Sequence, residues 1–73
     1  MTNEKKKQRV QTELAGLDAE ARLDDENGII IIWSQGEALA RVFCNPVEGT
    51  FEECASSAVK MIRDLDLAPK KIQ

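Results

Sequence analysis

Residues 28–36 read GIIIIWSQG, which places four consecutive isoleucines and the only tryptophan of the chain between two glycines. The stretch predicts a strand, in which successive side chains point to opposite faces. Ile29, Ile31 and Trp33 would share one face, and the two remaining isoleucines would share the other. Both faces of this strand are therefore apolar, and each of them needs a cover.

The chain has 73 residues, of which 42% are hydrophobic and 32% are charged. This balance is typical of a folded globular protein, and a domain of this size buries only about 60% of the surface that its unfolded chain exposes. We expect one small domain over residues 1–73, with a basic N-terminal arm at 1–9 and a loose C-terminal tail at 67–73. No apolar stretch approaches the roughly 18 residues of a membrane span, and the charged start does not resemble a secretory signal, so we expect no membrane association and a cytoplasmic location.

The clearest helix signal lies in GTFEEC, residues 49–54, where Thr50 and Glu53 have the spacing of a capping box. At 100° per residue the apolar side chains that follow fall on one side of a helix. The residues of this stripe are Phe51, Cys54, Ala55, Ala58, Val59, Met61, Ile62 and Leu65. Pro69 lies beyond the end of the helix. The stripe predicts a helix that lies on a core.

Two turn signals flank the isoleucine strand. Gln35-Gly36 joins it tightly to a second strand within residues 37–44, which Asn45-Pro46 ends. Asn27-Gly28 is a hairpin signal and favours a strand before it, within the alternating residues 17–24. Gly16 would then end a first helix of about residues 3–15.

The predicted order is therefore α-β-β-β-α, an α+β fold with both helices on one face of a three-stranded antiparallel meander. Because Val10, Leu14, Leu17 and Ala21 also have helical spacing, the alternative is α-β-β-α with one long first helix. Two short helices can cover one face of a small sheet, which leaves an apolar set for another partner. Helices that straddle the sheet and bury both faces, or self-association through the uncovered face, remain alternatives.

The residue types argue against an enzyme and against a cofactor or metal site. The chain has no histidine, which removes the commonest general base and the commonest metal ligand. Its two cysteines, Cys44 and Cys54, cannot complete a tetrahedral zinc site, and we expect them to be reduced, buried thiols.

The net charge of −3 conceals a gradient along the chain. Residues 1–11 carry a surplus of three positive charges, from Lys5, Lys6, Lys7 and Arg9 against Glu4. Residues 12–37 carry seven acidic residues against one arginine. A basic segment beside an acidic body is typical of a protein whose partner has mixed electrostatics, although such a run is also common in a solvated terminus.

The α-β-β-β-α order resembles that of double-stranded-RNA-binding domains over most of the chain. In that family a lysine-rich start of the second helix binds phosphates. The corresponding residues 48–53 here read EGTFEE, which would repel phosphates. The resemblance thus leaves Lys5, Lys6, Lys7 and Arg9 as an auxiliary nucleic-acid contact without sequence readout.

In size, acidic pI, lack of cofactor chemistry and basic N-terminal segment, the chain also resembles small phage-encoded regulators that bind host RNA polymerase. The resemblance implies docking on a polymerase subunit, with inhibition of transcription or antitermination. We therefore expect a non-enzymatic protein-binding regulator that acts by steric competition. Its expected anchors are Ile30, Ile32 and Phe43, with Arg41 at the rim. A nucleic-acid-binding domain and a homodimeric structural module are the alternatives.

Overall fold

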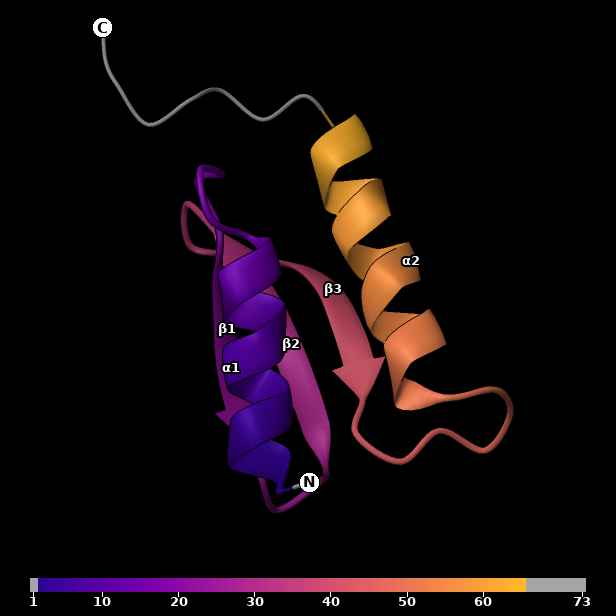
Figure 1. Ribbon diagram of the computed structural model, residues 1–73. Helices are drawn as coiled ribbons and strands as arrows, with labels where there is room; N and C mark the ends of the chain where they lie inside the picture. The colour runs from indigo at the N-terminus through magenta and orange to yellow at the C-terminus, as the bar shows by residue number, and fades with distance from the viewer. Residues whose placement is uncertain (1, 66–73) are drawn as a thin grey trace, which may run out of the picture.

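A computed structural model describes residues 2–65, and the predicted tail at 67–73 lies outside them. These residues form two helices and three strands in the order α-β-β-β-α (Figure 1), which confirms the predicted α+β fold. The elements are α1 (Asn3–Glu13), β1 (Glu20–Asp24), β2 (Ile29–Ser34), β3 (Glu37–Phe43) and α2 (Phe51–Asp64). Each strand pairs antiparallel with the next in the order β1-β2-β3, so β2 is central and the other two are edges.

The two hairpins differ in how closely they follow the sequence signals. Gln35 and Gly36 both have positive φ, 54° and 82°, and connect β2 to β3 as a two-residue turn of the kind that matches strand twist. The β1–β2 connection is longer than the predicted Asn-Gly turn, because Asp24 and Ile29 are the last pair and four residues separate them. Within this loop the Asp24 carboxylate accepts hydrogen bonds from the backbone and side chain of Asn27.

The alternative with one long first helix is wrong. Helix α1 ends at Glu13 with Leu14 as its C-cap, and Gly16 has a φ of 87°, a conformation that favours glycine. The chain then turns back, so that the alternating residues that follow form β1. Local alternation with period two thus prevails over the helical spacing of Leu17 and Ala21.

The core lies between one face of the sheet and both helices. In Figure 1, α1 lies across β1 and β2 while α2 lies alongside β3, and the packing pairs α1 with β1 and α2 with β3. The buried hydrophobic residues are Val10, Leu14, Ala21, Ile30, Ile32, Val42, Cys44, Phe51, Ala55, Ala58, Val59 and Ile62. These side chains come from all three strands and both helices, which confirms that the helices share a single face of the meander.

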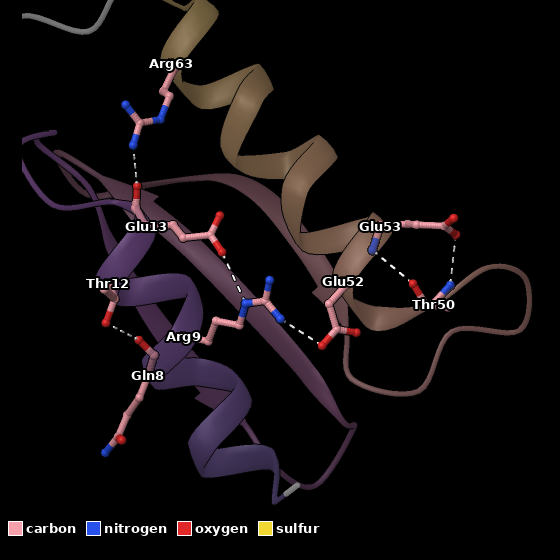
Figure 2. A network of polar contacts seen from close by, with 8 residues as sticks. All are labelled: Gln8, Arg9, Thr12, Glu13, Thr50, Glu52, Glu53 and Arg63. Carbon is pink, nitrogen blue, oxygen red and sulfur yellow. Dashed lines mark hydrogen bonds and ion pairs between the residues drawn. The ribbon is translucent and has the colours of Figure 1, made fainter.

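Helix α2 begins as the sequence predicts, but its apolar stripe is only partly covered. The Thr50 hydroxyl accepts from the Glu53 backbone N–H, and the Glu53 carboxylate accepts from the Thr50 backbone N–H, so the capping box is complete (Figure 2). Two members of the predicted stripe are exposed, Met61 at 45% and Leu65 at 50%. The stripe is therefore wider than the surface against which α2 packs.

Polar contacts join the two helices at their solvent side (Figure 2). Arg9 donates to Glu13 on its own helix and to Glu52 on α2, at 3.2 and 2.7 Å. Arg63 donates to the backbone carbonyl of Glu13 at 2.8 Å, which satisfies an acceptor that the end of α1 leaves without an intrahelical partner. These bonds fix the separation of the helices above the sheet.

Candidate protein-binding surfaces

The face of the sheet that the helices leave uncovered has an apolar centre. We call it the open face. Along β2 the buried and partly exposed residues alternate, so Ile29, Ile31 and Trp33 point away from the helices. Phe43 of β3 lies opposite Ile29 and is 54% exposed. Four large hydrophobic side chains therefore form one continuous strip on the face of the sheet that neither helix covers.

Charged residues border this strip on both edge strands. On β1, Arg22 lies opposite Ile31 and places its guanidinium 5.1 Å from the centre of the Trp33 ring. Glu20 accepts from Arg22 at 2.8 Å and so holds the guanidinium over the ring. On β3, Arg41 lies opposite Ile31 from the other side. An apolar centre inside a charged rim is the usual anatomy of a protein-protein interface.

The structure corrects two of the three predicted anchors. Ile30 and Ile32 are completely buried beneath the helices, so neither can contact a partner of the folded chain. Phe43 and Arg41 do lie on the open face, where their neighbours are Ile29 and Ile31. The strand register explains the choice between the two isoleucine sets, because Ile30 and Ile32 have only Ala21, Leu23, Ala40 and Val42 as cross-strand neighbours. The opposite set is flanked by charged residues that could not be buried at little cost.

The predicted basic arm is part of α1, because the helix begins at Asn3. Lys6 donates to the backbone carbonyl of Cys44 at 2.7 Å and lies 5.4 Å from the centre of the Phe51 ring. Lys7 pairs with Glu4, and Arg9 is held between two carboxylates. Lys5 is exposed and forms no ion pair within the described residues. Three of the four basic residues therefore have partners within the described chain, and an auxiliary nucleic-acid contact through these side chains stays a prediction.

The two edges of the sheet are not equally available. On β1 the side chain of Gln11 accepts from the Ala21 backbone N–H at 2.8 Å, so α1 occupies one outward-pointing donor of that edge. Directly after β3, the Cys44 N–H donates to the carbonyl of Gly28, the residue that precedes β2. By the alternation of an antiparallel ladder, the backbone groups of Arg41 and Phe43 then point outward. Among residues 2–65 no side chain or loop donates to these groups or accepts from them.

A groove that the sequence did not reveal runs between this open edge and α2. We call it the β3–α2 groove. It has a volume of about 450 Å³ and an apolar lining of Cys54, Ala58 and Met61 from α2 and Ala40 from β3, with Arg41, Glu53 and Ser57 at its sides. A smaller hollow of about 340 Å³ continues from Cys54 to Phe43 and the β3–α2 loop, where it includes Glu48. The only sequence signal for the groove was the excess width of the α2 stripe.

The two cysteines within the described chain are free thiols, as predicted, but they occupy different environments. Cys44 is buried, and burial raises the pKa of its thiol above the ordinary value of 9.0, with Asp25 adding to the rise and Lys6 opposing it. Cys54 is only partly buried, which corrects the prediction that both thiols lie in the core, and it faces the β3–α2 groove.

Comparison with known proteins gives no match to this chain: no family model, no curated protein and no solved structure is similar to it. No helix within residues 2–65 combines the length and the apolar character that crossing a bilayer requires. The same part of the chain contains no group of three or more side chains arranged to hold a metal ion. The open face and the β3–α2 groove remain the surfaces through which this chain could bind a partner.

Proposed function

We propose that the protein is a non-enzymatic binding module of the cytoplasm that docks on a larger protein through the open face of its sheet. The observation that carries this proposal is the one-sided cover. Both helices pack on the face that contains Ile30 and Ile32, while Ile29, Ile31, Trp33 and Phe43 form an apolar strip on the other. Large apolar patches inside a polar rim are typical of interaction sites in proteins of this kind.

The rim gives the interface its selectivity. Two arginines and the carboxylates of Glu20 and Asp24 surround the strip in cross-strand positions. Opposite charges on the partner would be steered toward these groups, whereas a surface with like charges in the same places would be rejected. Among the anchors, Trp33 and Phe43 are the aromatic residues, the type that commonly dominates binding energy when it enters a pocket.

Bacterial RNA polymerase is the first candidate partner. This choice rests on the resemblance in size, acidic pI and charge distribution to small phage-encoded regulators, for which docking on a polymerase subunit implies inhibition or redirection of transcription. Binding would act by occupying a surface that another factor needs. No chemical step on the partner is involved.

The test is capture of purified bacterial RNA polymerase on the immobilised protein after nuclease treatment. We expect the unmodified chain to retain the enzyme, and Ile31→Glu to reduce retention at least tenfold, because a carboxylate would be placed in the centre of the strip. Leu65→Glu is the matched control, since it makes the same change at an exposed position away from the sheet. Equal retention by both variants, or none by the unmodified chain, would exclude polymerase docking through this face.

Each of the two alternative functions, nucleic-acid binding and homodimer formation, predicts a result that can be measured separately. A nucleic-acid-binding function through α1 requires that Lys5→Gln and Lys7→Gln together cause a large loss of RNA or DNA binding with a steep salt dependence. A homodimer closed over the open face requires a concentration-dependent mass in sedimentation that Ile31→Glu converts to the monomer. We expect neither result.

A further inference from the structure

The outer edge of β3 and the groove beside it form a second surface, separate from the centre of the open face. Strand β3 is an edge of the sheet, and the backbone groups of Arg41 and Phe43 point outward without partners in the described chain. An unpaired edge is a template for one further strand. At the β1 edge Gln11 of α1 already occupies the Ala21 N–H, so a strand added there would lose one of its backbone hydrogen bonds.

Helix α2 leaves space above the position that a further strand would take. The side chains that α2 presents to the groove are mostly small, with Cys54, Ser57 and Ala58 in succession along the helix and Met61 beyond them. Every second side chain of a strand added beside β3 would point toward α2, into this volume. The unpaired backbone groups of β3 could thus bond the main chain of an added strand, and the apolar space beneath α2 could receive its side chains.

We propose that the β3–α2 groove binds an extended segment of a partner protein as a fourth strand of the sheet. The segment would carry small or medium-sized apolar side chains at alternate positions, directed at Cys54, Ala58 and Met61. Main-chain hydrogen bonds to Arg41 and Phe43 would supply affinity, and the pocket beneath α2 would supply selectivity.

Two carboxylates favour a basic residue at the end of the segment that lies beside them, while Arg41, which also lines the groove, carries the opposite charge. Glu53 lines the groove, and Glu48 lines the hollow that continues it. Neither carboxylate forms an ion pair within residues 2–65, in contrast to Glu52, which is paired with Arg9. A lysine or arginine of the bound segment would be attracted to these two carboxylates.

A second copy of the chain does not fit this position. Two copies paired antiparallel through their β3 edges would place both α2 helices, each packed against its own β3, on the same face of the joined sheet, where the two β3 strands would lie about 4.8 Å apart. Packed helices require about 8–10 Å between their axes. A segment that brings no helix of its own avoids this clash, which is the reason for proposing a partner's extended chain as the occupant.

The test is selection of binders from a displayed library of random eight-residue peptides on the full-length protein. We expect enriched sequences to alternate apolar and polar residues and to carry lysine or arginine near one end. A synthetic copy of an enriched peptide should slow hydrogen exchange at the Arg41 and Phe43 amides. Methylation of those peptide nitrogens that face β3 should weaken binding at least tenfold, because each loses its donor.

Two matched variants connect the binding to the groove. Ser57→Arg fills the volume above the strand position, whereas Ser56→Arg places the same side chain at the neighbouring exposed position outside the groove lining. We expect at least a tenfold loss of peptide affinity for Ser57→Arg and less than a twofold change for Ser56→Arg.

Failure to enrich any peptide, or equal affinity for Ser57→Arg, would overturn the proposal. So would a concentration-dependent dimer that Ser57→Arg abolishes, because the groove would then hold a second copy. Ile31→Glu should leave peptide affinity unchanged, so that failure of the open-face proposal and failure of the groove proposal give different results.

Discussion

The side-chain oxygen of Gln11 accepts a hydrogen bond from the backbone N–H of Ala21 at 2.8 Å. A helical residue thus occupies a donor at the outer edge of β1, ten positions further along the chain. Unpaired strand edges promote association between chains, and folded proteins protect them in several ways. Here a side chain of α1 occupies one outward-pointing donor of the β1 edge, whereas no side chain within residues 2–65 occupies those of the β3 edge.

Removal of this contact should destabilise the protein and leave the Ala21 N–H without its acceptor. We expect Gln11→Ala to lower the free energy of unfolding by about 1 kcal/mol, because a partly buried N–H loses its acceptor. Urea denaturation measures the loss. Gln8→Ala, on the exposed side of the same helix, should change stability by less than about 0.5 kcal/mol. Equal effects of the two substitutions would show that Gln11 has no specific role.

The two isoleucine sets should differ sharply in their contribution to stability. Ile32→Ala should cost about 2–5 kcal/mol, because its side chain is fully buried and its loss leaves a cavity. Ile31→Ala should cost about 1 kcal/mol, since that side chain is only partly buried on the open face. Denaturant midpoints of the two variants make the comparison. A larger loss for Ile31→Ala would contradict the assignment of the faces.

The capping box of α2 should make a measurable contribution to stability. Thr50→Ala removes the acceptor for the Glu53 N–H and should lower the free energy of unfolding by about 1 kcal/mol. The matched control is Thr12→Ala within α1, where the hydroxyl donates only to the Gln8 carbonyl (Figure 2). Because alanine is the better helix former, this control should leave stability unchanged or slightly higher. Thermal unfolding followed by circular dichroism distinguishes the two variants.

The buried thiol of Cys44 should make stability depend on alkaline pH. Burial raises the pKa of this thiol in the folded chain above 9.0, so the unfolded chain loses the proton first as pH rises. The contribution of the group is fully present below the unfolded pKa and is lost as pH rises toward the folded pKa. We therefore expect the free energy of unfolding to fall from about pH 9 upward, and to fall less steeply in Cys44→Ala.

Urea denaturation at about pH 8 and about pH 10 supplies the measurement for both proteins. Other groups also titrate in this range, so the informative quantity is the difference in slope between the unmodified chain and Cys44→Ala. Cys54→Ala serves as the control because that thiol is only partly buried. Identical slopes for all three proteins would exclude a role for Cys44.

The sequence by itself determined the order and boundaries of most elements, because these depend on neighbours along the chain. The Thr50 and Glu53 spacing starts α2, and the Gln35-Gly36 turn fixes the second hairpin. The alternation of apolar and polar residues before Gly28 predicted β1, although the loop between β1 and β2 is longer than expected. The sequence also named Phe43 and Arg41 as contacts on an uncovered face, although it left open which residues of the third strand lie there, and both side chains are exposed.

Only the tertiary structure decided which isoleucines are buried, because a strand with period two presents two apolar sets that are equivalent until its neighbours are aligned. The register places Ile32 beside Ala21 and Ala40, and it places Ile31 between two arginines. The protected edge of β1 and the groove beside β3 likewise depend on where each helix lies over the sheet, which is set by packing between residues distant in sequence.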